Sequence, residues 1–173
     1  MDELAFQAFL EENFPFSSGI GIGDDAAVIE GPQGKYSVIT KDILIEDVHF
    51  KFDYFSLEEL AEKAIAVNLS DIAAMGARPT FFFLGLGIPK RFENQIKPFF
   101  MRIKALCQAY RIQLAGGDLS ASDRFFISVT MHGTTNRPVL RRDAKEKDHI
   151  CISRVPGRSE LGLRLLLSGT ALD

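Results

Sequence analysis

The stretch SLEELAEKAIAVNLSDIAAMG, residues 56–76, carries the clearest structural signal in the sequence. Ser56 and Glu59 form the pattern of a capping box, in which each side chain bonds the other residue's main-chain N–H at a helix start. The apolar residues that follow recur at helical spacing and define one buried stripe. Gly76 favours a helix end, and Pro79 blocks continuation. We therefore predict a helix over residues 56–76.

Helical and strand patterns occur on both sides of this helix. Residues 125–132 alternate between apolar and polar side chains, which predicts an antiparallel strand with one buried face. Other predicted helices cover residues 2–13, 93–110 and 159–167, and other predicted strands cover residues 26–29, 36–40, 80–86, 112–115 and 150–152.

The composition is that of an ordinary folded domain. The chain has 173 residues, 46% hydrophobic and 25% charged, which excludes disordered, collagen-like and coiled-coil chains. The net charge is −3, so we expect neither a nucleic acid nor a membrane as partner. The longest apolar run, residues 81–88, is too short to span a bilayer. Cys107 and Cys151 lie far apart in sequence, which favours a reducing cytoplasm over a disulfide framework.

Four groups of aspartates stand out in the sequence, each at or near a predicted turn or element end. They are Asp24 with Asp25, Asp42, Asp71 and Asp118. Carboxylates are the ligands that Mg²⁺ prefers, usually a few of them together with substrate phosphates. Aspartate is also common in turns and helix caps, so each position taken singly has a purely structural interpretation as well. If the four groups converge in the fold, they predict a magnesium site.

Asp71 is the most informative of these residues because it lies inside the predicted helix. An aspartate there competes with the backbone for hydrogen bonds and lowers helix propensity. Asn68 lies three residues earlier and therefore shares its face of the helix. This face presents an amide and a carboxylate to its surroundings, which favours a functional role for Asp71.

Other polar residues carry weaker signals. The glycine-rich run of residues 19–23 lacks the lysine and hydroxyl residue of a Walker loop. The pair Arg141 and Arg142 suits phosphate binding but is also common on solvated loops. His49 either contacts a substrate or only carries an exposed hydrogen bond, while His132 and His149 have no neighbours that suggest zinc.

Four motifs in a fixed order resemble the N-terminal half of thiamine-monophosphate kinase. They are residues 21–27 (GIGDDAA), 42–50 (DILIEDVHF), 63–77 (KAIAVNLSDIAAMGA) and 115–118 (AGGD). The third is the most specific, since its letters read almost as the family signature. The family belongs to a superfamily with aminoimidazole-ribonucleotide synthetase, and the resemblance covers roughly residues 19 to 167.

The resemblance implies transfer of the ATP γ-phosphoryl group to thiamine monophosphate, with Mg²⁺ as cofactor and thiamine diphosphate as product. No covalent catalytic residue is required, because this chemistry depends on positioning and charge stabilisation. The family's site residues correspond to Asp25, Thr40, Asp42, Asp71 and Asp118 for the metal, to Gly117, Asp118 and Arg142 for the nucleotide, with Gly117 in the nucleotide-binding turn, and to His49 for the thiamine substrate.

The resemblance also implies a fold and an assembly. The fold class is α+β, a two-layer α/β sandwich with a mixed, largely antiparallel sheet, and two copies pair through their sheets with ATP sites near the interface. We expect residues 1–173 to form a single ATP- and Mg-binding N-terminal domain, with residues 158–173 as the start of a second domain that relatives possess. Lys41 stands where relatives tend to have a small hydroxyl residue, and Phe100 where many have a tyrosine near the nucleotide.

Three candidates remain open at this point. The first is the kinase or its nucleotide-binding half, and the second is a noncatalytic nucleotide-binding or dimerisation module. The third is a sibling ATP-dependent enzyme such as aminoimidazole-ribonucleotide synthetase. Selenophosphate synthetase fits least, because that family has a reactive cysteine or selenocysteine near its N-terminus, whereas the first cysteine of this chain is Cys107.

Overall fold

The computed structural model describes residues 2–169 and divides into two compact units, the first ending at Arg141 and the second beginning at Arg142. The first unit contains a six-stranded sheet. Its helices are α1 (Glu3–Asn13), α2 (Leu57–Ala74) and α3 (Lys97–Tyr110), with short 3-10 turns at η1 (Pro32–Gly34) and η2 (Lys90–Phe92). Its strands are β1 (Gly19–Ile20), β2 (Ala27–Glu30), β3 (Tyr36–Ile45), β4 (Arg78–Ile88), β5 (Gln113–Ala121) and β6 (Phe126–Thr135).

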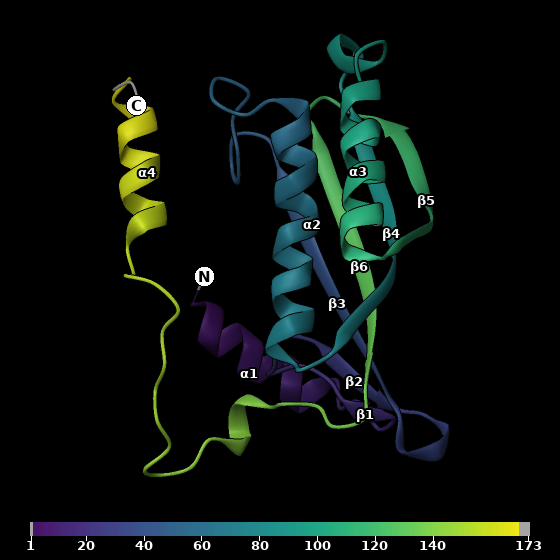
Figure 1. Ribbon diagram of the computed structural model, residues 1–173, viewed down its shortest axis with the longest axis vertical. Helices are drawn as coiled ribbons and strands as arrows, with labels where there is room; N and C mark the ends of the chain where they lie inside the picture. The colour runs from purple at the N-terminus through teal and green to yellow at the C-terminus, as the bar shows by residue number, and fades with distance from the viewer. Residues whose placement is uncertain (1, 170–173) are drawn as a thin grey trace. The chain divides into compact units, whose positions relative to one another are not determined.

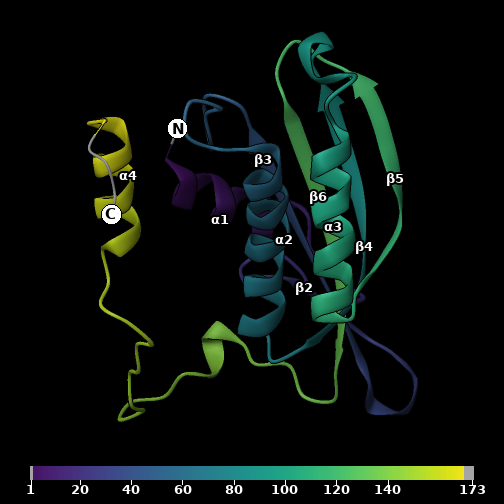
Figure 2. The same ribbon diagram turned by 45° about the horizontal axis from the view of Figure 1, so that its top comes forward.

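The strands are ordered β1-β2-β3-β6-β4-β5 across the sheet. Strands β4 and β5 run parallel, and α3 connects them. The other described neighbours pair antiparallel. Figures 1 and 2 show α2 and α3 side by side along one face of this sheet. The predicted fold class, an α+β sandwich with a mixed and largely antiparallel sheet, is confirmed.

Helix α2 forms as the sequence predicts. The Ser56 side chain accepts a hydrogen bond from the Glu59 main-chain N–H, and the Glu59 carboxylate accepts one from the Ser56 N–H. The buried stripe of the helix includes Leu60, Ile65 and Ile72, each at most 1% exposed. Burying each such side chain contributes about 1.5–3 kcal/mol, so the stripe holds the helix against the sheet.

Strand β6 lies in the middle of the sheet and alternates as predicted. Ile127, Val129 and Met131 are buried under the helices, whereas Ser128 and Thr130 on the opposite face are partly exposed. The neighbouring rows of β3 and β4 follow the same alternation, since Leu44 and Leu84 are buried while Ile43 and Phe83 are exposed. The sheet therefore has one face in the core of this unit and one face lined by partly exposed side chains.

Several strands are longer than the local pattern predicts. Strand β3 continues past Thr40 to Ile45 because each of its residues has a partner in β6. Strand β5 continues through Gly116, Gly117 and Asp118, where we predicted a turn, because these residues pair with β4. A sequence pattern read within one strand does not contain this information.

The second unit contains the helix α4 (Arg158–Leu167), which matches the predicted helix, and the 3-10 turn η3 (Arg141–Asp143) lies at the division between the units. The strand predicted at residues 150–152 is wrong: no strand is assigned there, and Ile150 is 96% exposed. An apolar run needs a partner strand to become a strand itself, and none pairs with it among the described residues. Residues 170–173 of the expected second-domain start lie outside the described residues. Within residues 2–169, no helix is long and apolar enough to cross a membrane.

Candidate functional site

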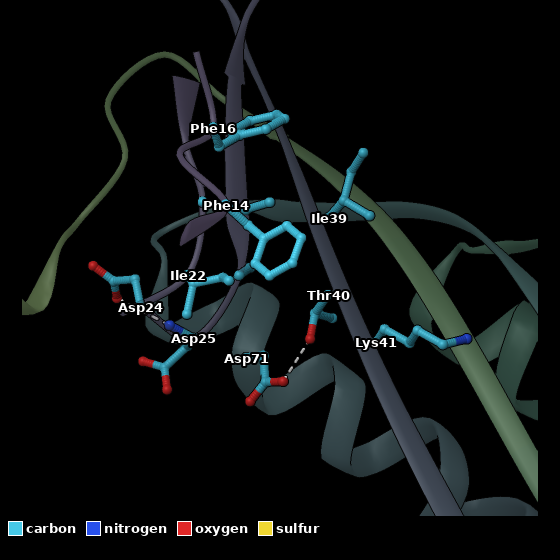
Figure 3. Close-up of a pocket in the computed structure, with 12 residues that line it drawn as sticks. Phe14, Phe16, Ile22, Asp24, Asp25, Ile39, Thr40, Lys41 and Asp71 are labelled. Carbon is cyan, nitrogen blue, oxygen red and sulfur yellow. Dashed lines mark hydrogen bonds between the residues drawn. The ribbon is translucent and has the colours of Figure 1, made fainter. Parts of the chain in front are cut away.

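A pocket of 430 Å³ lies where the loop before β2 meets β3 and α2 (Figure 3). One part of its lining is apolar and the other part is acidic. The apolar side chains are Phe14, Phe16, Ile22 and Ile39, and the polar ones are Asp24, Asp25, Thr40, Lys41 and Asp71. The glycine-rich run brings its own backbone to the pocket at Gly21, where an added Cβ would lie 2.6 Å from the Cβ of Phe16. This close approach explains the glycine there.

Thr40 and Asp71 join the sheet to α2 at the floor of this pocket. The Thr40 hydroxyl donates a 2.6 Å hydrogen bond to Asp71 Oδ2, and Thr40 is only 4% exposed. Figure 3 shows both side chains directed toward the pocket. Two residues predicted for one metal site therefore lie in direct contact, although 31 positions separate them in sequence.

Asp24 and Asp25 follow the glycine-rich run and are held by Arg141. The Arg141 guanidinium forms an ion pair with Asp25 Oδ1, and its Nε donates to Asp25 Oδ2 at 3.4 Å. The main-chain N–H of Arg141 donates to Asp24 Oδ2 at 3.1 Å. The hydrogen bond to Asp25, together with the charges of Asp24 and Asp71, raises the pKa of Arg141. Arg141 thus contacts Asp24 and Asp25 directly, while Asp71 acts on it only through its charge.

Asp42 lies within electrostatic range of both Asp71 and His49. Burial raises the pKa of the Asp42 carboxyl, the charge of Asp71 raises it further, and His49 opposes both. His49 Nδ1 accepts a 3.0 Å hydrogen bond from the Ile45 N–H. This leaves Nε2 as the protonated nitrogen, available as a donor to a ligand. The ammonium group of Lys63 bonds the His49 carbonyl at 2.6 Å and so ties this loop to α2.

Gly117 and Asp118 lie on β5, which is the edge strand at the other end of the strand order from β1 and β2. Three strand spacings separate β5 from β3, roughly 14 Å at the usual interstrand distance. Both residues line a second pocket, of 190 Å³, together with Leu84, Leu114 and Phe100. Within one chain the structure therefore divides the predicted site residues into two groups, with Asp25, Thr40 and Asp71 in one and Gly117 and Asp118 in the other.

Lys41 lines the first pocket, but its ammonium group points away from the aspartates (Figure 3). Neighbouring side chains on a strand alternate between faces, so Lys41 and Thr40 diverge. Lys41 Nζ bonds Ser128 Oγ at 2.7 Å and Thr130 Oγ1 at 3.4 Å on β6. Its charge is therefore directed to the hydroxyl groups of the uncovered sheet face.

Arg142 and Arg141 have different places in the structure, although the sequence pairs them. Arg142 belongs to the second unit, whereas Arg141 closes the first and contacts the acidic pocket. The sequence suggests both arginines for phosphate and favours Arg142 through the family resemblance, but the contact of Arg141 with Asp25 was missed. The basic pair itself was the available signal. Phe14 and Phe16 were also missed, because they follow α1 without any helical or strand periodicity.

The oxygen donors of the first pocket suit a hard cation whose coordination shell is completed by oxygens of a bound ligand. Asp25 and Asp71 supply carboxylate oxygens and Thr40 a hydroxyl, and Mg²⁺ in proteins is commonly held by one or two carboxylates plus substrate phosphates. Among residues 2–169, no three His, Cys, Asp or Glu side chains gather closely enough to hold an ion alone. Asn68, one turn from Asp71, is fully buried, and its Oδ1 has no partner among these residues. Its Nδ2 donates to the Ala64 carbonyl at 3.0 Å, so Oδ1 is the polar atom of this side chain that is left for another group.

The sequence of this mixed-sheet domain matches a known family. The family model described as AIR synthase related protein, N-terminal domain, matches residues 23–135, and the chain belongs to this family. Among curated proteins, it is 39% identical over 158 residues to the thiamine-monophosphate kinase of Bacillus subtilis and 37% identical over 157 residues to that of Haemophilus influenzae. The resemblance drawn from the four motifs is confirmed.

Solved structures agree with the sequence relatives. The fold matches AaThiL complexed with AMPPCP and TMP with a TM-score of 0.89 at 32% identity, over 99% of this chain and 54% of that one. It matches the thiamine monophosphate kinase of Aquifex aeolicus with a TM-score of 0.84 at 30% identity, over 100% of this chain and 56% of that one. The two curated matches each cover 89% of this chain but 49% and 47% of the relatives, so the chain spans about half their length.

Proposed function

We propose that this chain is the ATP-binding N-terminal half of a cytoplasmic thiamine-phosphate kinase, which transfers the ATP γ-phosphoryl group to thiamine monophosphate. The observation that carries the proposal is the contact of Thr40 with Asp71 beside Asp25, in a chain whose relatives are thiamine-monophosphate kinases. The related AaThiL was solved with AMPPCP and TMP, which supports both substrate classes. The products are ADP and thiamine diphosphate.

The first pocket suits the phosphate end of this reaction. Phosphoryl transfer needs positioned reactants and charge stabilisation rather than a protein nucleophile. Asp25 and Asp71 would hold Mg²⁺ with Thr40, with Asp42 close by, and the bound ion would neutralise charge on the phosphate oxygens. Thr40 orients the Asp71 carboxylate through their hydrogen bond.

His49 is the proposed contact to the acceptor substrate. Its imidazole is fixed by the Ile45 N–H at Nδ1, so Nε2–H is the group that can donate to a phosphate or ring nitrogen. Lys63 holds the main chain of the same loop. The loop is thus positioned by the capping-box helix that also carries Asp71.

The second pocket is the proposed site of the nucleotide base. Gly117 and Asp118 line it beside Phe100, whose ring offers an apolar surface to a planar base. Arg142 is the proposed arginine on the nucleotide phosphates. Asp118 remains a proposed metal ligand near this second pocket.

We also propose that two copies pair through the sheet face opposite α2 and α3. Ile43 is 41% exposed and Phe83 is 47% exposed on this face, and pairing would remove both from water. Asp118 pairs with Gly85 in the same cross-strand row as Ile43, so Asp118 belongs to the face of the proposed interface. Sedimentation velocity of the chain and of Ile43→Lys tests this: dimers that dissociate in the variant support the interface.

Calorimetric titration with AMPPCP, with and without Mg²⁺, tests the nucleotide site at a protein concentration that favours a dimer. Magnesium-dependent binding near one nucleotide per chain is the expected result, and Asp71→Asn should abolish it. Glu62→Gln, on the exposed face of the same helix, is the matched control and should bind normally. Unchanged binding in Asp71→Asn would remove Asp71 from the site.

A noncatalytic nucleotide-binding or dimerisation module is the alternative, and the half-length match favours testing it directly. The test measures thiamine diphosphate formed from ATP and thiamine monophosphate by the 173-residue chain and by a chain extended by a relative's second half. Product from the extended chain supports the kinase, whereas nucleotide binding without product in both supports the module.

A further inference from the structure

Arg141 is not among the residues that line the first pocket, but it contacts two aspartates that do. Its guanidinium contacts both oxygens of Asp25, through the ion pair to Oδ1 and the 3.4 Å contact from Nε to Oδ2. Its own main-chain N–H is fixed to Asp24 Oδ2. The guanidinium is therefore anchored next to the carboxylate that the proposed function assigns to a metal.

We propose that Arg141 and a divalent cation compete for the Asp25 carboxylate, so that Arg141 sets the affinity of the metal site. The inference rests on the proposed function for the existence of that site. A cation at Asp25 would share oxygens with the guanidinium and would place two positive charges at contact distance. Binding of one therefore requires the other to withdraw.

The exposure of the two partners makes the exchange feasible. The Arg141 side chain is 65% exposed and that of Asp25 is 26% exposed, whereas Asp24 is 6% exposed. Exposed ion pairs contribute little to stability, because water and salt screen them. Asp24 Oδ2 holds the Arg141 main chain, so only the side chain, whose Nε lies 4.0 Å from Asp24 Oδ1, has to move. After withdrawal, the guanidinium remains close enough to meet the phosphate oxygens of a ligand.

Lys41 provides an internal comparison. It lines the first pocket and carries the same charge as Arg141, but its ammonium group is bonded to Ser128 and Thr130 on the other face of the sheet. If only the number of positive charges near the pocket mattered, Lys41 and Arg141 would have similar effects. If direct contact with Asp25 matters, only Arg141 affects the cation.

The test measures Mn²⁺ binding to the full chain, without nucleotide, by the electron paramagnetic resonance signal of free Mn²⁺ in 0.15 M salt. At this ionic strength the Debye length is about 8 Å, which suppresses long-range charge effects. Arg141→Gln should lower the dissociation constant about two- to fivefold, the range that a partly exposed ion pair supports. Lys41→Met should leave the constant unchanged, and Asp71→Asn should weaken binding in either background.

A second readout follows the arginine directly. In ¹H–¹⁵N spectra, the Nε–H signal that Arg141→Gln removes should shift when Mg²⁺ is added to the unsubstituted chain. Two results would overturn the competition and leave the metal site standing. The first is an equal gain in Mn²⁺ affinity for Lys41→Met. The second is an unchanged dissociation constant for Arg141→Gln while Asp71→Asn loses Mn²⁺ binding. Absence of Mn²⁺ binding in the unsubstituted chain and in every variant would overturn the metal site as well. Calorimetry with AMPPCP measures nucleotide binding separately, so the two failures can be distinguished.

Discussion

The hydroxyl of Thr40 on β3 and the carboxylate of Asp71 on α2 meet through a 2.6 Å hydrogen bond, and this contact joins the sheet to its covering helix inside the acidic pocket. Thr40 is buried, so the bond has little competition from water. A hydrogen bond to a charged partner in such surroundings is stronger than a neutral one. The same contact therefore serves both the fold and the orientation of a candidate metal ligand.

Thr40→Val should destabilise the chain by about 1–2 kcal/mol, because valine has the same shape but leaves Asp71 without its donor. Urea denaturation at neutral pH, followed by circular dichroism, measures this loss. Thr134→Val is the matched control, since Thr134 is exposed on β6 and should change stability by less than about 0.5 kcal/mol. Equal losses in the two variants would show that the hydroxyl of Thr40 is not the cause.

Glu46 fixes the start of the loop that carries His49. Its carboxylate forms an ion pair with Arg91 and accepts a 2.9 Å hydrogen bond from the Phe125 N–H, and its side chain is only 12% exposed. Glu46→Ala should cost about 1–3 kcal/mol, because the buried Phe125 N–H is left unpaired. Hydrogen exchange of the Phe125 amide should accelerate in parallel with the loss measured in urea.

Glu62→Ala is the comparison for Glu46, since Glu62 also pairs with an arginine, Arg102, but is 54% exposed. The expected loss is less than about 1 kcal/mol, as for other surface pairs. A loss in Glu62→Ala as large as that in Glu46→Ala would mean that ion pairing, rather than the backbone contact, determines both values.

His132, on the sheet face opposite the helices, should make the free energy of unfolding depend on pH. Burial lowers the pKa of His132 below 6.5, and its ring stacks on Phe81 with centroids 4.6 Å apart. As pH falls through 6.5, the unfolded chain takes up a proton at this position before the folded chain does. The free energy of unfolding therefore falls with pH in this range, and levels off below the folded pKa.

His132→Phe should remove this part of the pH dependence, because phenylalanine keeps the stacking surface and does not titrate. The measurement compares urea midpoints of the chain and the variant from pH 8 to pH 5. The difference between them should grow in favour of the variant as pH falls. A constant difference across this range would show that His132 titrates alike in both states.

Helix α2 was predictable because all its determinants are local. The capping box, the apolar stripe and the terminal Gly76 lie within 21 residues of one another, and tertiary packing only confirms them. The ends of β3 and β5 were not predictable in this way. Their lengths depend on β6 and β4, which the local sequence of each strand does not contain.

The residues of the candidate site also fall into those that the sequence identified and those that only the tertiary fold brings together. Asp25, Thr40 and Asp71 were identified from residue type, spacing and resemblance, and they do line one pocket. Arg141 reaches Asp25 across 116 positions, a contact that no spacing rule supplies. The separation of Asp118 from this group follows from the strand order, because β6 and β4 are inserted between β3 and β5.

Gly117 gives the last prediction, because its role in the strand is steric. An added Cβ would lie 1.8 Å from the main-chain oxygen of Leu84, the register partner of Gly117 on β4. A backbone atom cannot turn aside as a side chain does, so β5 would have to leave its position. Gly117→Ala should therefore destabilise the chain by about 1–3 kcal/mol or more and open the second pocket.

Gly116→Ala is the matched control at the neighbouring residue. There an added Cβ meets only the ring of Phe83 at 3.4 Å, an ordinary contact with a side chain that is free to adjust. Hydrogen exchange of the β5 amides should rise sharply in Gly117→Ala and little in Gly116→Ala. If both variants exchanged at the unsubstituted rate, β5 would not be held against Leu84, and the pocket formed by Gly117, Asp118 and Phe100 could not serve as a preformed nucleotide site.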